Sequence, residues 1–179
     1  CSGDDLLFFP NPTTAVSNVI NSLQLTEADE VLMTEHEYGA LVRSWKASAE
    51  RVGLTIRQQT VSIPVTTREK FVEEFWSGVN KKTRVIFISH ITSSTALIFP
   101  VEEICTLAHE SGIITIIDGA HVPGHIPLDI SSLNCDFYTG ACHKWLCAPK
   151  GSSFLYVKAT HHEWMRPLVV SWGEEGDDP

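Results

Sequence analysis

The sequence lacks any apolar run long enough to cross a bilayer. Its most hydrophobic stretches, VIFISHI (85–91) and GIITIID (112–118), are short and interrupted by polar side chains, whereas a spanning helix needs about 20 apolar residues. No basic segment followed by an apolar one opens the chain, so no signal peptide is recognised. We therefore expect a cytoplasmic protein that has no membrane partner.

Positive charge is also scarce. The chain has 13 Lys and Arg against 22 Asp and Glu, a formal net charge of −9. Nucleic acids and anionic membrane surfaces attract basic proteins. We therefore expect no nucleic-acid partner.

The cysteines show neither a CxxC pair nor zinc-ribbon spacing. Five are scattered along the chain, at positions 1, 105, 135, 142 and 147. An odd, scattered set fits reduced thiols in the cytoplasm better than a disulfide scaffold, and we predict no metal site. The first residue is Cys1 rather than Met, as expected of a fragment or a processed product.

Short β-like runs alternate with amphipathic helical ones along the 179 residues, enough for the core of one domain. Strands are expected at 6–9, 30–34, 54–61, 84–90, 112–118, 135–140 and 152–157. Helices are expected at 14–24, at 38–52, after a capping box of Thr66 and Glu69, and from Pro100 to just before Gly112. This alternation predicts an α/β fold, a mostly parallel seven-stranded sheet with helices on both faces. The last two strands are joined by a loop too short for a crossover helix, so that pair is expected to be antiparallel.

Polar residues gather where the predicted strands end. Asp118 ends one strand, His90 ends another, His36 follows a third, and Lys144 lies just past a fourth. Considered alone, Asp118 could equally be a helix N-cap, and Lys144 could be an ordinary solvent-exposed lysine. Ligands of parallel sheets bind beyond the carboxyl ends of the strands. Because these four residues lie at that edge, they predict a ligand-binding site there.

One cofactor, pyridoxal 5'-phosphate, would use these residues together. Lys144, in YTGACHKWLCAPKG (138–151), is an amine beside apolar strands, and a Schiff base with an aldehyde relieves the cost of burying its charge. A carboxylate such as Asp118 keeps the ring nitrogen protonated. The segment PNPTTAVSN (10–18) offers a strand-to-helix turn whose N–H groups suit a phosphate, although Thr13 and Thr14 alone read equally well as a plain N-cap.

Several segments carry a resemblance to a known family. They are FFPNPTTAV (8–16), TEHEYGA (34–40), SHITSSTALIFPVEEI (89–104), DGAH (118–121) and DFYTGACHKWLCAPKGSSFLYV (136–157). Together they resemble the class V aminotransferase family of pyridoxal-phosphate enzymes, closest to the isopenicillin N epimerase-like branch, with cysteine desulfurases and selenocysteine lyases as relatives. The likeness spans nearly the whole chain, and its Asp-to-His-Lys portion is the most specific part.

The resemblance implies a fold and an organisation. It implies the large domain of the fold type I pyridoxal-phosphate transferases, in a fragment of a longer homodimeric enzyme. Residues 1–160 would form the cofactor-binding large domain. Residues 161–179 would begin the connection to a C-terminal small domain.

The resemblance also implies roles around the cofactor ring. Lys144 would be the catalytic residue, forming the Schiff base and then moving the α-proton. Asp118 would pair with the ring nitrogen. His36 would stack on the ring face, and His121 would contact the phenolic oxygen.

Other residues would hold the phosphate by the same resemblance. Thr14 and the backbone amide of Ala15 would bind it, assisted by the side chain of His143. Ser93 occupies a position where desulfurases often carry Asn, so a contact with the phenolic oxygen is not carried over to it.

We expect a pyridoxal-phosphate enzyme that acts at the α-carbon of an amino acid. The family resemblance implies epimerase-like or lyase-like chemistry. Cysteine desulfurase or C–S lyase activity is one alternative. A metal-dependent hydrolase using Asp118, His121 and His125 is another, because HVPGH has a ligand-like spacing; Pro123 and Gly124 argue against a helix there. A third is a non-catalytic relative that keeps the cofactor site.

Overall fold

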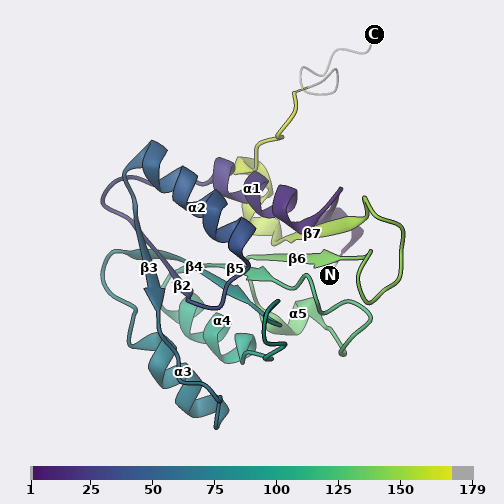
Figure 1. Cartoon of the computed structure of the whole chain (residues 1–179). Helices are drawn as coiled ribbons and strands as arrows, with labels where there is room; N and C mark the ends of the chain where they lie inside the picture. Colours follow the sequence, from purple (N-terminus) through teal and green to yellow (C-terminus); the bar gives the residue numbers. More distant parts are fainter. Residues whose placement is uncertain (1, 171–179) are drawn as a thin grey trace.

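Seven strands form one twisted sheet in the computed structural model, which describes residues 2–170 (Figure 1). The strands are β1 (Leu6–Phe9), β2 (Glu30–Thr34), β3 (Thr55–Gln59), β4 (Thr83–Ser89), β5 (Ile114–Asp118), β6 (Phe137–Ala141) and β7 (Ser153–Val157). Their order across the sheet is β1-β7-β6-β5-β4-β2-β3. Each predicted strand is present, with bounds that differ by at most three residues.

Only β7 runs against its neighbours. Strands β3, β2, β4, β5 and β6 pair in parallel, whereas β7 pairs antiparallel with both β6 and β1. The loop between β6 and β7 has no crossover helix, as a return in the opposite direction allows. The predicted mostly parallel α/β sheet is confirmed, including its antiparallel last pair.

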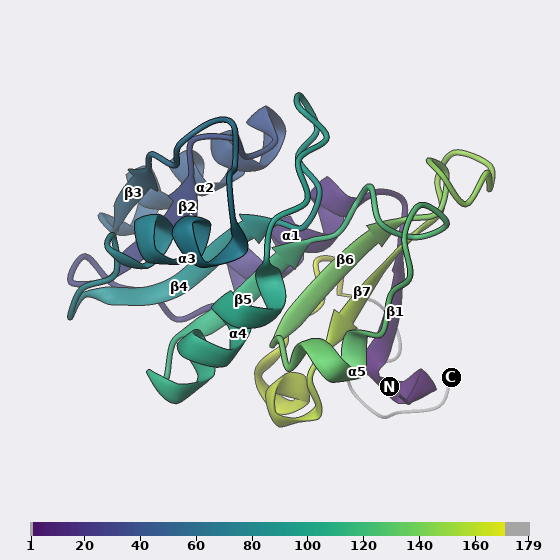
Figure 2. The ribbon, with the colours of Figure 1, turned by 90° about the horizontal axis from the view of Figure 1, so that it is seen from below.

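Helices cover both faces of this sheet. They are α1 (Pro12–Ser22), α2 (Gly39–Val52), α3 (Arg68–Trp76), α4 (Val101–Glu110) and the short α5 (Ile130–Leu133), with 3-10 turns at Gly3–Asp5 and Ala159–Trp164. Helices α1 and α2 lie on one face, and α3, α4 and α5 lie on the other (Figures 1 and 2). The sequence did not predict α5. None of the described helices is long and apolar enough to cross a membrane.

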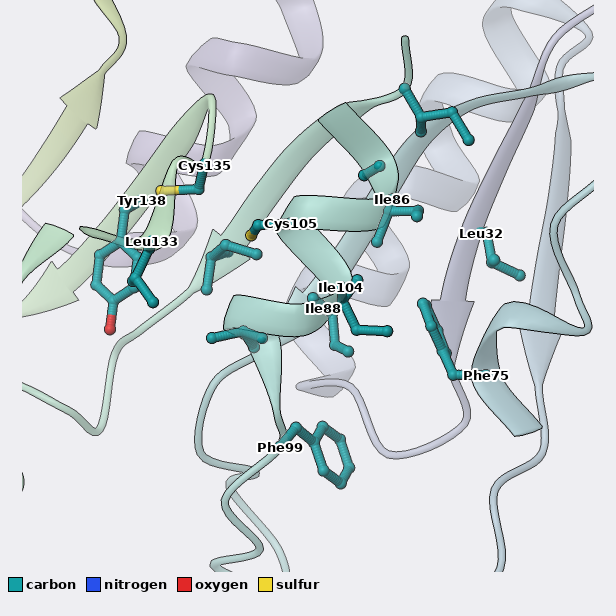
Figure 3. Close-up of a cluster of buried hydrophobic side chains, with 14 of the residues drawn as sticks. Leu32, Phe75, Ile86, Ile88, Phe99, Ile104, Cys105, Leu133, Cys135 and Tyr138 are labelled. Carbon is teal, nitrogen blue, oxygen red and sulfur yellow. The ribbon is translucent and has the colours of Figure 1, made fainter. Parts of the chain in front are cut away.

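The alternation of side chains along β4 divides the core into two layers. Val85 and Phe87 pack with α1 and α2, whereas Ile86 and Ile88 pack with α3 and α4. Figure 3 shows the second layer, with Phe75 of α3 beside the strand residues. These four side chains of β4 are fully buried, and each contributes about 1.5–3 kcal/mol of hydrophobic stabilisation.

Helix α3 begins one residue later than the sequence predicted. Its N-cap is Thr67, whose side chain accepts a hydrogen bond from the backbone N–H of Lys70. A capping box needs the acidic residue three positions after the cap, and from Thr67 that position is Lys70. The predicted box of Thr66 and Glu69 is therefore wrong, because the adjacent threonine takes the cap.

The predicted boundary at residue 160 falls inside the 3-10 turn Ala159–Trp164. Trp164 packs against Phe137 of β6, with ring centroids 5.7 Å apart. Residues 171–179 lie outside the described part of the chain. The division into residues 1–160 and 161–179 stays a prediction.

Gly119, which follows Asp118, lies directly against the ring of Tyr138. A Cβ atom built on Gly119 would lie 2.2 Å from ring atoms of Tyr138, and Tyr138 is fully buried. Gly119→Ala should therefore lower the free energy of unfolding by about 1–3 kcal/mol through overpacking. Denaturant titration checks this, with Gly3→Ala as the control because no atom lies within 4 Å of that position. Equal stability of the two variants would contradict the packing argument.

Candidate cofactor-binding site

A cavity of about 120 Å³ lies at the carboxyl ends of the parallel strands, where α/β sheets bind ligands. Four parts of the chain surround it: the β1–α1 turn, the β2–α2 loop, the ends of β4 and β5, and the loop after β6. The polar side chains that line it include Thr13, Tyr38, Ser89, Asp118, His121 and Lys144. Asp118 and Lys144, which the sequence assigned to one edge, thus share one cavity.

Asp118 is a buried carboxyl at the last position of β5, only 4 % exposed. One oxygen, Oδ1, accepts a hydrogen bond of 3.0 Å from the N–H of Ala120. Burial raises the pKa of Asp118, while the Ala120 N–H and the charge of Lys144 oppose that rise. A positively charged ligand group beside Asp118 would stabilise its ionised form further.

Lys144 and His121 both line the cavity, and they contact each other. The Nζ atom lies 3.0 Å from His121 Nε2 and 6.0 Å from the centroid of the Tyr38 ring. Burial lowers the pKa of Lys144, and the charge of Asp118 opposes this. A lysine with a lowered pKa is a better nucleophile at neutral pH, because more of its amine is uncharged.

His143 also lines the cavity, and its tautomer follows from its partner. Its Nδ1 atom lies 3.1 Å from the carbonyl oxygen of Ser152. Because a carbonyl only accepts, Nδ1 carries a hydrogen.

The start of α1 forms another wall of the cavity. Asn11 Oδ1 accepts hydrogen bonds from the N–H and the hydroxyl of Thr14, at 2.9 and 3.1 Å. The N–H of Ala15 donates to the carbonyl of Asn11 at 3.2 Å. Both predicted phosphate-binding residues therefore bond to the N-cap, whereas Asn11, Pro12 and Thr13 line the cavity.

The loop between β2 and α2 presents Tyr38 to the cavity. His36 is not part of the lining; its ring lies 6.3 Å from that of Phe99. No hydrogen-bond partner is found for the buried Nε2 atom of His36. The sequence analysis did not predict Tyr38 as a residue of the cavity. Its position, two residues after His36 and just before Gly39, could have indicated an aromatic side chain near the site.

Glu37 is a buried carboxyl that the sequence analysis did not identify. Its Oε2 accepts from the N–H and the hydroxyl of Ser89, at 2.8 and 2.6 Å, and its Oε1 lies 2.5 Å from Thr34 Oγ1. Burial, with a smaller contribution from the charge of Asp118, raises the pKa of Glu37 to about 7. The hydroxyl of Thr34 donates to Oε1, so Glu37 links Thr34 at the end of β2 to Ser89 at the end of β4. No spacing in the sequence signals this contact, because it joins β2 to β4.

The raised pKa of Glu37 makes stability depend on pH. Between the ordinary value of 4.5 and about 7, the folded protein keeps a proton that the unfolded chain has released. This contribution is fully present below pH 4.5 and is lost as the pH rises through about 7.

Glu37→Gln should remove that dependence, because an amide does not titrate in this pH range. The free energy of unfolding of the wild type minus that of the variant should decrease by about 3 kcal/mol as the pH rises from 4 to 8. Urea titrations at a series of pH values measure the difference. The control is Glu35→Gln in the same loop, where the side chain is 43 % exposed. A pH-independent difference between wild type and Glu37→Gln would contradict a buried, protonated Glu37.

The metal alternative gains no support from the side chains. Among residues 2–170, no group of three or more His, Cys, Asp or Glu side chains is arranged to hold a metal ion. His125 instead stacks on Trp145, with centroids 4.3 Å apart, and its Nδ1 lies 3.1 Å from the carbonyl oxygen of His121. Asp118, His121 and His125 do not form a common ligand set.

The profile of the family described as "Aminotransferase class-V" matches residues 2–174. The chain is 36% identical to isopenicillin N epimerase of Amycolatopsis lactamdurans, over 97% of this chain and 45% of that protein. It is 38% identical to isopenicillin N epimerase of Streptomyces clavuligerus, over 92% of this chain and 42% of that protein. The chain therefore spans less than half the length of these relatives.

Solved structures of C-DES have the same fold. One, a variant with glycine covalently linked to its pyridoxal-phosphate cofactor, has a TM-score of 0.87 at 25% identity, covering 99% of this chain and 48% of that one. Another, with the same TM-score and identity, covers 99% of this chain and 49% of that one and is described as the cystine C–S lyase with its product cysteine persulfide. The family and these neighbours indicate pyridoxal phosphate as the cofactor.

Proposed function

The chain belongs to the class-V aminotransferase family, and from that premise we propose that its cavity binds pyridoxal phosphate for chemistry at the α-carbon of an amino acid. The observation that carries this proposal is the shared cavity of Asp118 and Lys144 at the strand ends. When bound, this cofactor withdraws electrons from the α-carbon. The protein's own residues bind it, orient it and move the proton.

The residues present fit the two charged ends of this cofactor. The buried Asp118 carboxyl suits a protonated ring nitrogen, which would also lower the pKa that burial raises. At the other end, the start of α1 and the side chain of His143, which lines the cavity, suit the phosphate. The lining residue Thr13 joins the predicted Thr14 and Ala15 at this end.

Lys144 has the properties of the residue that binds the cofactor covalently and moves the α-proton. Its side chain lines the cavity, and burial lowers its pKa. His121, 3.0 Å from this amine, is near enough to contact the phenolic oxygen next to the attached aldehyde. We assign the ring-stacking role to Tyr38, which lines the cavity, in preference to the His36 of the sequence prediction.

We propose epimerase-like chemistry for the whole protein. Two relatives of 36% and 38% identity are isopenicillin N epimerases. The C–S lyase described for C-DES is the second candidate, supported by a TM-score of 0.87. Heavy-water exchange of the α-proton without loss of sulfur would favour the first, and sulfur release from cysteine or cystine the second.

A covalent adduct tests the assignment of Lys144. Adding pyridoxal phosphate should produce an absorbance change that borohydride makes permanent, and mass spectrometry should find the adduct on Lys144. Lys144→Ala should lose the adduct, because no other amine is among the residues that line the cavity. Lys150→Ala, a change six residues along the same loop, is the matched control and should retain it. An adduct on Lys150, or on no residue, would overturn the proposal.

Asp118→Asn tests the pairing with the ring nitrogen. An amide cannot neutralise a protonated ring, so α-proton exchange in heavy water should slow by about a hundredfold or more, the loss typical of removing one electrostatic contact. The adduct on Lys144 should still form. Exchange at the wild-type rate would refute the role of Asp118, and a normal adduct without exchange in the wild type itself would favour a non-catalytic relative.

We also propose a cytoplasmic homodimer. Ile98 and Leu146, both more than half exposed, lie on the two loops that border the cavity, as apolar residues at a subunit interface would. The four cysteines of residues 2–170 are free thiols, which fits a reducing compartment. Analytical ultracentrifugation of the whole protein tests the dimer.

A further inference from the structure

Trp145 directly follows the proposed cofactor-binding lysine, and the proposed function gives it no role. Its indole Nε1 lies 3.2 Å from Nδ1 of His121. Its ring stacks on His125 at a centroid distance of 4.3 Å and an interplanar angle of 26°. The other nitrogen of His121, Nε2, is the atom 3.0 Å from Lys144 Nζ. His121 therefore bridges the indole and the amine.

The indole determines which nitrogen of His121 carries the hydrogen. An indole N–H only donates, so Nδ1 of His121 must accept with its lone pair. Neutral His121 then has its hydrogen on Nε2, which faces Lys144. This hydrogen is donated to Nζ, and only an uncharged amine has a lone pair to accept it.

The opposite arrangement is disfavoured by the same contact. A charged Lys144 would donate to Nε2, which would move the hydrogen of neutral His121 to Nδ1. That hydrogen would then point at the indole N–H, and two donors would face each other. From this geometry we infer that Trp145 is a positioning residue that fixes the tautomer of His121 and thereby keeps the amine of Lys144 uncharged for attack on an aldehyde.

The environment of Lys144 and His121 both favours and opposes the charged form of Lys144. Asp118 on β5 favours the charged form of Lys144, whereas burial opposes it. Burial, then the charges of Lys144 and His125, lower the pKa of His121, which keeps its ring neutral as the tautomer argument requires. The remaining cavity groups near Lys144 are Tyr38 and His143. In the cofactor-free protein, the contact between Trp145 and His121 counters the attraction of Asp118.

The inference rests on the proposed function only for the identity of the aldehyde. The tautomer of His121 belongs to the cofactor-free protein and can be observed there. Trp145→Phe removes the indole N–H and retains an aromatic ring against His125. Trp76→Phe is the matched control, because Trp76 lies at the end of α3 and packs on the core.

Nitrogen-15 NMR of the histidine rings in the whole, cofactor-free protein gives the first measurement, with His121→Asn to assign the signal. In the wild type and in Trp76→Phe, His121 should carry its hydrogen on Nε2. In Trp145→Phe, this preference should be lost. A hydrogen on Nδ1 in the wild type, or no change in Trp145→Phe, would overturn the inference.

The rate of adduct formation with pyridoxal phosphate as a function of pH gives the second measurement. At neutral pH, Trp145→Phe should react about three- to tenfold more slowly than wild type, the effect of losing one hydrogen bond. Its rate profile should move to higher pH and converge with that of the wild type once the amine is uncharged. A purely structural role would slow the reaction equally at every pH and would refute the inference.

The two proposals fail separately. If the wild type forms the adduct on Lys144 and Trp145→Phe keeps the wild-type pH profile, the role of Trp145 is wrong and the proposed function stands. If the wild type forms no adduct, the proposed function fails, and the NMR signal alone decides the tautomer.

Discussion

The site depends on the parallel register of three central strands. Ser89, the last residue of β4, is paired with Asp118 at the end of β5, and Asp118 with Thr139 of β6. Because the strands run in the same direction, their carboxyl ends meet at one edge, and the loops that leave this edge surround one cavity. A shift of one residue would turn Asp118 to the other face of the sheet. The packing of β5 opposes that shift, because Ile116 packs in the layer of α1 and α2 and Ile117 in the opposite layer.

Burial gives the site its chemistry. The carboxyls of Asp118 and Glu37 are both fully desolvated, and burial is the main cause of the raised pKa of each. The two differ in their partners: Glu37 is hydrogen-bonded on both oxygens by Ser89 and Thr34, whereas Asp118 accepts from Ala120 and faces the cavity. Glu37 therefore joins β2 to β4, and Asp118 remains available to a ligand.

The sequence predicted the sheet because the fold follows from local patterns. Strands such as β4 are continuous apolar runs, and Pro and Gly mark the ends of helices. The existence of the strands and helices and their order along the chain could therefore be predicted from the amino-acid sequence. Asp118 and Lys144 could be assigned to one edge of the sheet because Asp118 ends one strand and Lys144 lies just past another. Tyr38, Glu37 and Trp145 were not identified, because their roles depend on loop conformation and on partners far away in the chain. The role expected of His36 stays a prediction: the residue lies on the β2–α2 loop and is not among those that line the cavity.

The environment of Lys144 shows why neighbours in space matter more than neighbours in sequence. Its attraction to Asp118 and its contact with His121 both come from a segment more than 20 residues earlier. Trp145 is adjacent in sequence, yet it acts on the amine through the imidazole of His121, because its indole N–H lies 3.2 Å from Nδ1. A carboxylate near a lysine favours the charged amine, whereas nucleophilic attack needs the uncharged one. A fixed imidazole tautomer reconciles the two, because it lets Asp118 stay close to its ligand without holding the proton on the lysine.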